Sequence, residues 1–431
     1  MFPPFRQRAP CAHRSLVNAI AERADALRRA YRSLLLVGTA GLLALSCQHA
    51  EAGLNSGPEY ATLQAIYNST DGANWTTSTG WGSGDACSWY GITCDQDLMP
   101  EDNTSHVVYI SMSYNNLNGP LPDLTGLTAL DSLELDNNLL SGSIPALGGM
   151  ASLRIVTIYL NQLTGSIPAL AGMANLEYFS ADDNQLTGPI PELAGIPKLR
   201  GFSVPRNQLT GVIPDLAGLT AFQHLDVGTN HLTGSIPSLT GLTSLSLLDV
   251  RENQLTGSLP DLTDPVGLQY LFANDNRLTG SIPVLSGLTE LALVAVDDNQ
   301  LTGSLPALTG FPYLYYFGAS NNDLTGSIPV LSELTGTQYF DVHGNRLTGS
   351  IPDLTGLELY DFYVGDNQLT GAVPMAPAVL ARASLCPNLL DTTSQPSIDP
   401  AWNEATGFGP WWANPTGTNN CDGLFLGGFD A

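Results

Sequence analysis

Aromatic side chains recur at fixed distances before a repeated asparagine, and their type and spacing suit ligand binding. Tyrosine offers a large contact area with little loss of side-chain entropy. We expect these rings to form an aromatic strip that binds a protein or peptide, with a polysaccharide stacked on the rings as the second ligand class. The candidate residues are Tyr178, Tyr270, Phe272, Tyr316, Tyr339 and Tyr363, with Tyr360 as a minor candidate at the end of the strip.

Carboxylates occupy neighbouring positions of the same pattern, and the candidates are Asp226, Asp249, Glu252, Asp275 and Asp298. If successive repeats form adjacent strands, about 4.8 Å apart, these like charges repel one another and create a negative patch. Four outward positions per repeat carry thirteen acidic residues and two arginines, which favours a basic partner. The alternative interpretation is structural, with solvated carboxylates and half-buried packing rings.

Histidines and carboxylates give little indication of catalysis. His224 and Asp226 lie on one side of an expected strand, but no serine or cysteine stands in a recognisable nucleophile turn beside them. Adjacent carboxylates such as Asp182 and Asp183 point apart rather than facing each other as acid and base. Calcium on the acidic patch would need a loop with calcium-binding spacing, which the sequence lacks. We expect no enzyme activity, no cofactor and no metal.

These candidates belong to a repeat. The phrase Asn-x-Leu-x-Gly-x-(Ile/Leu/Val)-Pro occurs twelve times, and ten of the eleven intervals between its asparagines are 23 residues, the last being 22. Apolar residues stand eight, five and three positions before the asparagine in eleven of the twelve repeats. Such a period predicts stacked coils that bury their apolar faces against one another.

Each repeat also contains a strand pattern. The sequence Leu-x-x-Leu-x-Leu-x-x-Asn, as from Leu245 to Asn253, alternates apolar and polar residues, which predicts one parallel sheet of about 12 short strands. We expect the asparagine amide to turn inward and satisfy backbone groups in the bend. Between the first repeated asparagine, Asn115, and the last, Asn367, ten asparagines form this structural ladder: Asn138, Asn161, Asn184, Asn207, Asn230, Asn253, Asn276, Asn299, Asn322 and Asn345.

In its commonest form, Asn-Gln-Leu-Thr-Gly-Ser-Ile-Pro, the phrase resembles the plant-type leucine-rich repeat of receptor ectodomains and polygalacturonase-inhibiting proteins. Segments before the repeats are similar to the N-terminal cap of that family: Leu63-Gln-Ala-Ile-Tyr67, Asn74-Trp75, Gly80-Trp81 and Cys87-Ser-Trp-Tyr-Gly-Ile-Thr-Cys94. The resemblance implies an α/β solenoid, mostly β, coiled as a right-handed curved superhelix with a concave strand face. The repeats depart from the plant pattern in having 23 residues rather than 24.

The N-terminal segment has the pattern of an export signal. Seven of the fifteen basic residues precede the apolar run Leu34–Ser46, in a chain whose net charge is −25. Ala50-Glu51-Ala52 offers a small-x-small cleavage site. Lipidation of Cys47, anchoring the protein to the cell envelope, is one alternative, and a twin-arginine signal at Arg28-Arg29 is another.

Removal of that segment would leave four cysteines, Cys87, Cys94, Cys386 and Cys421. Pairing Cys87 with Cys94 and Cys386 with Cys421 is the simplest of three connectivities and gives disulfide-capped ends. The sequence thus predicts four segments: an export signal (1–52), an N-terminal cap (53–106), twelve leucine-rich repeats (107–375), and a C-terminal cap and tail (376–431).

Together these features predict a secreted, non-catalytic recognition module that binds an extracellular protein or peptide on its concave face. The alternative is a glycan-binding or envelope-attached protein with an adhesive or structural role. The negative charge disfavours nucleic acid, and no second apolar run long enough to span a membrane follows residue 52. The ending Leu424-Phe-Leu-Gly-Gly-Phe-Asp430 resembles terminal tags of secreted proteobacterial proteins, which suggests a bacterial source.

Overall fold

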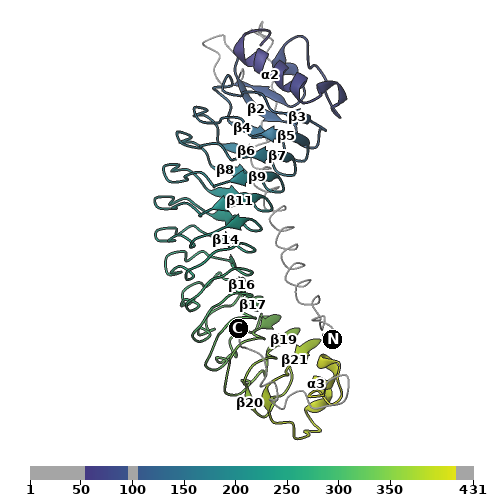
Figure 1. Cartoon of the computed structure of the whole chain (residues 1–431). Coiled ribbons are helices and arrows are strands. Elements are labelled where there is room, and N and C mark those ends of the chain that lie inside the picture. Colours follow the sequence, from purple (N-terminus) through teal and green to yellow (C-terminus); the bar gives the residue numbers. More distant parts are fainter. Residues whose placement is uncertain (1–53, 96–104, 414–431) are drawn as a thin grey trace, which may run out of the picture. The chain divides into compact units, whose positions relative to one another are not determined.

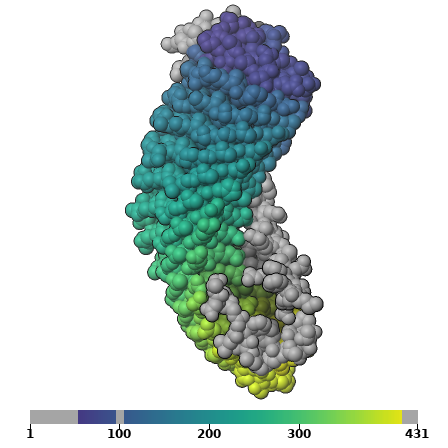
Figure 2. All heavy atoms as spheres, viewed as in Figure 1, coloured from purple at the N-terminus to yellow at the C-terminus, as the bar shows by residue number. Residues whose placement is uncertain are grey.

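The structure, a computed structural model, describes residues 54–95 and 105–413 (Figure 1). The chain divides into two compact units, Met1–Glu51 and Ala52–Ala431, and only the second contains described residues. The predicted signal, the lipidated Cys47, Cys421 and the C-terminal tag all lie outside the described residues. In the second unit the repeats form a β-solenoid, as predicted, and the space-filling view shows its coils as a stack of parallel ridges (Figure 2).

One long sheet runs through the whole solenoid and has 14 strands. Twelve of them, all parallel, correspond to the twelve repeats: β2 (Val107–Ser111), β4 (Ser132–Glu134), β6 (Ile155–Thr157), β8 (Tyr178–Ser180), β10 (Gly201–Ser203), β12 (His224–Asp226), β14 (Leu247–Asp249), β15 (Tyr270–Phe272), β16 (Leu293–Ala295), β17 (Tyr316–Gly318), β18 (Tyr339–Asp341) and β19 (Asp361–Tyr363). The remaining two are β1 (Ile92–Cys94), which is antiparallel to β2, and β21 (Arg382–Ser384), which follows the last repeat.

A second ladder follows the asparagine in each repeat. Its strands are β3 (Asn118–Pro120), β5 (Leu139–Ser143), β7 (Gln162–Gly165), β9 (Gln185–Gly188), β11 (Gln208–Gly211), β13 (His231–Leu232), β20 (Thr370–Gly371) and β22 (Leu389–Leu390). Single bridges such as Ser258 to Thr279 continue the ladder between β13 and β20. The middle residue of the Leu-Thr-Gly triplet is exposed and is a threonine in ten successive repeats, from Thr164 to Thr370, so we call this row the threonine ladder.

Leucines at the constant apolar positions fill one continuous core between the two ladders. The middle residue of each long-sheet strand from β4 to β19 points into it, and where that residue is phenylalanine the rings stack from coil to coil. Phe317 lies 5.7 Å from Phe340, and Phe340 lies 5.8 Å from Phe362, between ring centroids. Because a single coil cannot bury its own leucines, each coil depends on its neighbours for its core.

The repeated asparagine joins each coil to the one before it, as Asn253 illustrates. Its amide nitrogen donates to the carbonyl oxygens of Val250 and Arg251 in its own bend, at 3.2 and 3.0 Å, and to that of Val227 in the preceding coil, at 3.1 Å. Its carbonyl oxygen accepts the Leu232 amide at 2.9 Å. One buried side chain thus satisfies four backbone groups, which gives the asparagine a structural role.

The residue before each repeated asparagine adopts a left-handed backbone conformation, with φ between 51° and 65° in all twelve repeats. Only glycine, asparagine and aspartate enter this region readily. Seven of the twelve positions carry one of these three residues. The conformation of the bend therefore accounts for much of the acidic character of this column.

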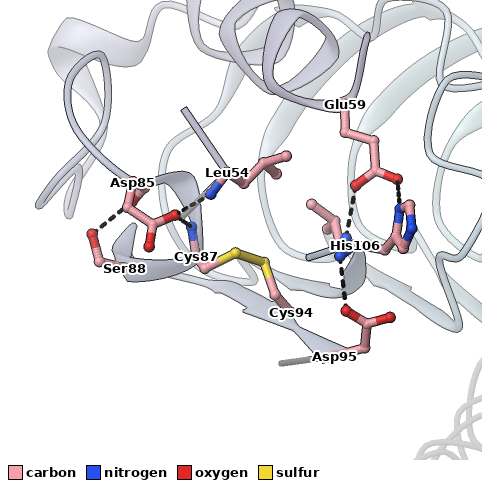
Figure 3. The surroundings of a disulfide bond; sticks show 9 residues. Leu54, Glu59, Asp85, Cys87, Ser88, Cys94, Asp95 and His106 are labelled. Carbon is pink, nitrogen blue, oxygen red and sulfur yellow. Dashed lines mark hydrogen bonds and ion pairs between the residues drawn. A yellow bond between two sulfur atoms is a disulfide. The ribbon is translucent and has the colours of Figure 1, made fainter. Parts of the chain in front are cut away.

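The N-terminal cap lies at the end of the solenoid next to β2 (Figure 1), and Figure 3 shows the surroundings of its disulfide. It contains α2 (Gly57–Ser69), the short helices η1 (Gly72–Asn74) and η2 (Ala86–Ser88), and β1. The predicted Cys87–Cys94 disulfide closes it, with 5.5 Å between Cα atoms. The first repeated asparagine, Asn115, has no preceding coil, so it exchanges two hydrogen bonds with the backbone of Thr77 in the cap.

At the C-terminal end the structure contains a coil beyond the twelve that the sequence suggested. Strand β21 adds to the long sheet, and Asn388 bonds as the repeated asparagines do, accepting the Leu369 amide at 2.8 Å. Helix α3 (Asp399–Thr406) then covers this end, and its Trp402 donates to the Pro374 carbonyl at 2.9 Å. Cys386 is disulfide-bonded.

Candidate functional site

The parallel register of the long sheet decides which predicted binding residues become neighbours. In the column six positions before the asparagine, Tyr316 lies directly beside Tyr339. Leu293 separates Tyr316 from Tyr270, and three strands separate Tyr270 from Tyr178. The predicted strip is therefore interrupted in its N-terminal part, and its rings gather over β17 to β19.

Two further tyrosines belong to this group of rings, and each lies one residue before a strand of the long sheet. Ring centroids of Tyr315 and Tyr339 are 5.1 Å apart, and Tyr339 lies 6.3 Å from both Tyr316 and Tyr360. We call these four residues, Tyr315, Tyr316, Tyr339 and Tyr360, the aromatic cluster. Tyr316 is buried, Tyr315 and Tyr339 are half-buried, and Tyr360 is exposed, so the cluster has one packed ring and three that reach the surface.

An arginine lies at the C-terminal border of the aromatic cluster. Arg382 on β21 holds its guanidinium 5.8 Å from the centroid of the Tyr360 ring, and its Nε donates to the Asp361 carboxylate at 2.8 Å. Burial raises the pKa of Asp361, and the hydrogen bond and charge of Arg382 oppose that rise. The Tyr360 ring and the Asp361 carboxylate together therefore bind the guanidinium group of Arg382.

Burial, reinforced by neighbouring carboxylates, raises the pKa of the Tyr316 and Tyr363 hydroxyls and keeps them protonated. Burial raises the pKa of Tyr363 to about 12, and the charge of Asp361 adds to this effect. Burial, reinforced by Asp297 and Asp341, raises the pKa of Tyr316 well above its ordinary value of 10.0. Neutral rings in a negative environment favour cationic ligands over anionic ones.

The acidic candidates divide into two groups. Asp226 and Asp249 are buried and lie side by side on β12 and β14, as the sequence predicted. The Arg251 guanidinium approaches the Asp249 carboxylate at 3.4 Å and lies 5.1 Å from the Phe272 ring centroid. These side chains therefore belong to one packed group of opposite charges and a ring.

The second acidic group is in the left-handed column before the asparagines. Glu252 accepts the Thr229 hydroxyl at 3.4 Å, and Asp275 accepts the Asn274 amide at 2.9 Å. Asp298 accepts the Asn321 amide at 3.1 Å. The left-handed backbone favours aspartate at two of these positions, and local hydrogen bonds engage all three carboxylates.

Other chemistry receives little support from the geometry. His343 Nδ1 and the Asp341 carboxylate are 2.6 Å apart within one coil. Across residues 54–95 and 105–413, no three metal-ligating side chains converge on a common point. In the same ranges, no helix has the length and apolar character needed to cross a membrane.

Sequence reasoning missed Tyr315 and Arg382 and gave Tyr360 only a minor place. These residues lie seven positions before the asparagine or, for Arg382, in the additional coil. A tyrosine seven positions before the asparagine in two repeats so close together was the available signal. The significance of this spacing becomes apparent only in the structure, where Tyr315 and Tyr360 both lie beside Tyr339.

Comparison with known proteins agrees with this architecture. Residues 56–95 match the leucine rich repeat N-terminal domain, and the repeats that follow form a leucine-rich-repeat solenoid. No curated protein matches the chain.

Solved structures similar to the chain are plant receptor ectodomains. The ectodomain of the Arabidopsis thaliana receptor kinase GASSHO1/SCHENGEN3, in complex with CASPARIAN STRIP INTEGRITY FACTOR 2, is 29% identical over 79% of this chain and 45% of its own, with a TM-score of 0.66. For PEPR1-AtPEP1 the values are 26%, 77%, 51% and 0.61. For the plant peptide hormone receptor RGFR1 in complex with RGF2 they are 31%, 64%, 50% and 0.55. The chain spans about half the length of these ectodomains.

Proposed function

We propose that this protein is a non-catalytic recognition module that binds an extracellular peptide or protein segment along the outward face of its long sheet. The aromatic cluster carries the proposal, because it gathers surface-reaching rings and carboxylates at positions that the repeat does not hold constant. Tyrosine-rich surfaces of this kind provide most of the energy in many protein interfaces. The acidic surroundings favour a basic partner.

The structural neighbours support this class of function. RGFR1 is described as a peptide hormone receptor, and its structure contains RGF2. A sheet of the same architecture can therefore present a peptide-binding surface, although fold alone does not specify a ligand. We extend to this chain the peptide-binding role and none of the particular peptides.

The proposal places the protein outside the cell. The Cys87–Cys94 disulfide suits an oxidising compartment. Export through residues 1–52, lipid anchoring at Cys47 as the alternative, and a bacterial source are the further proposals of the sequence. Each is tested by the N-terminal residue and mass of the protein isolated from its native host.

A binding screen tests the function. Immobilised protein would be exposed to displayed extracellular peptides and, separately, to insoluble glycans at low and high salt. The matched variants are Tyr339→Ala with Tyr360→Ala on the aromatic cluster, and Thr256→Ser with Thr302→Ser on the threonine ladder. We expect basic peptides to be retained at low salt and lost in the tyrosine variant, while the threonine variant binds normally.

Two results would overturn the proposal. Peptide binding that survives the tyrosine variant would place recognition elsewhere on the molecule. Retention on a glycan at high salt, without peptide binding, would support the adhesive role instead, because uncharged contacts are insensitive to ionic screening.

A further inference from the structure

We infer that the aromatic cluster contains a subsite for an arginine side chain of the partner, with the guanidinium stacked on Tyr339. This inference rests on the proposed function and specifies the chemistry of one position within it. Three observations carry it: an arginine of the chain itself in an equivalent setting, the arrangement of rings around Tyr339, and the carboxylates on both sides of that ring.

Arg382 shows that this part of the sheet can bind a guanidinium group. Its guanidinium lies 5.8 Å from the Tyr360 ring centroid while its Nε bonds to Asp361 at 2.8 Å. Asp361 and Arg382 are register neighbours on β19 and β21. A cation on this face is thus bound by two features at once, a ring from the strand entrance and a carboxylate from the strand itself.

Rings and carboxylates also lie around Tyr339, one strand earlier, although its register neighbour Asp361 is the carboxylate that Arg382 binds. Tyr315, from the entrance of β17, lies 5.1 Å from Tyr339 with their planes at 59°, and Tyr360 lies 6.3 Å away on the other side. Tyr339 is half-buried, so its ring is held by its neighbours and still reaches the surface. Fixed rings lose little entropy when a ligand stacks on them.

Carboxylates border Tyr339 in two directions. Asp361 is its register neighbour on β19. Asp341 lies two residues further along β18, and side chains two apart in a strand point to the same face. The charges of both carboxylates raise the pKa of nearby Tyr363, which shows that the negative field reaches across these strands.

Ring geometry favours guanidinium over ammonium. The guanidinium is planar, weakly hydrated and able to stack on an aromatic face while donating hydrogen bonds in its own plane. An ammonium group is a compact, strongly hydrated charge that gains less from stacking. The subsite should therefore prefer arginine to lysine at equal charge.

The test uses tetra-arginine, tetra-lysine and tetra-citrulline amides, titrated by calorimetry into the purified full chain and its variants. We expect tetra-arginine to bind at least about fivefold more tightly than tetra-lysine, the size of a cation–π contact of about 1 kcal/mol. Tetra-citrulline, which keeps the planar group and lacks the charge, should bind weakest.

Three variants locate the effect. Tyr339→Leu should weaken tetra-arginine binding about fivefold and abolish its advantage over tetra-lysine. Tyr339→Phe keeps the ring and should bind as the parent does. Tyr109→Leu changes an exposed tyrosine of the same column on β2 and should have no effect. Thermal unfolding of each variant shows whether the fold is retained.

Equal affinity for the arginine and lysine peptides would overturn the inference, as would equal losses in Tyr339→Leu and Tyr109→Leu, since binding would then be diffuse charge attraction. Failure of the subsite is distinguishable from failure of the proposed function. A partner found in the peptide screen that depends on Tyr360 but not on Tyr339 would refute the subsite and leave peptide recognition standing. Absence of any sheet-dependent peptide would refute the function itself.

Discussion

The long sheet and the threonine ladder are formed by the same repeats but differ in how much their sequences vary. From Thr233 to Thr370, each threonine hydroxyl donates to the carbonyl oxygen of a glycine in the preceding coil, at 3.2 to 3.4 Å. On the long sheet, one column contains tyrosine, glycine, histidine, leucine, aspartate and arginine. Hydrogen bonding within the fold therefore explains why the threonines are constant. The variable column of the long sheet has no such constraint, and its positions are available for recognition.

The largest effect is expected at a constant buried position. Asn253→Ala would remove hydrogen bonds to four backbone groups and leave them buried without partners. We expect a loss of about 3 kcal/mol in the free energy of unfolding, measured in urea. As control, Asn175→Ala removes a half-buried asparagine whose hydrogen bond to the Ala151 carbonyl is solvent-exposed, and should cost under about 0.5 kcal/mol. Equal losses would show that exposure and bonding pattern do not distinguish the two asparagines.

A smaller effect is expected at a constant position on the threonine ladder. Gly280 has φ of +75°, and an added Cβ would lie 3.3 Å from the Ser258 Cβ in the preceding coil. Gly280→Ala should therefore destabilise the protein by about 1.5 kcal/mol. Gly336→Ala is the matched control, because that glycine does not have a positive φ and a Cβ there would lie 3.4 Å from its nearest neighbour. A neutral Gly280→Ala would mean that the ladder tolerates side chains there.

A change of opposite sign is expected in the left-handed column of the long sheet. Glu252 has φ of 51°, which glutamate tolerates poorly and asparagine tolerates well. Glu252→Asn should stabilise the protein by about 0.5 kcal/mol in thermal or urea unfolding, despite the loss of the Thr229 hydrogen bond. Destabilisation would show that the carboxylate is needed where it is, and would strengthen its claim to a role in binding.

The smallest effect at neutral pH concerns the protonation of the aromatic residues. Burial raises the pKa of Tyr363 from 10.0 to about 12. The unfolded chain therefore loses this proton first, and the stabilising contribution falls as the pH rises from about 10 to about 12. Tyr363→Phe should flatten the decline, measured as unfolding temperature against pH, while Tyr109→Phe, at an exposed tyrosine, should not. Identical profiles would remove Tyr363 from the negative environment proposed for this face.

Most of the fold was predictable because each repeat contains the residues that determine its own bend and its own part of the core. The position of the asparagine determines the bend, and the leucines before it determine the core. The thirteenth coil was missed because the segment around Asn388 keeps the leucine and asparagine spacing but lacks the glycine and proline of the phrase. Its identity becomes visible only when β21 is seen to pair with β19.

The candidate site was predictable in part. The tyrosine columns could be written from the period alone, but which rings touch depends on side-chain direction across strands, and this placed Tyr315 against Tyr339. The acidic column before the asparagines is a predicted binding patch, and its backbone conformation could not be foreseen because the sequence does not display φ. The structure shows a backbone conformation that favours aspartate there for its own reasons.

The way in which Asn115 ends the asparagine ladder has a consequence for how such a protein can evolve. Thr77 in the cap gives Asn115 the backbone partners that a preceding coil would give, so the cap joins the stack through the same bonds as any coil. Duplication or loss of one unit of 23 residues would then leave both ends intact and move the aromatic cluster by about 4.8 Å along the stack. Gain or loss of repeats by genetic slippage can therefore change the distance between contact points on the solenoid in steps of one coil.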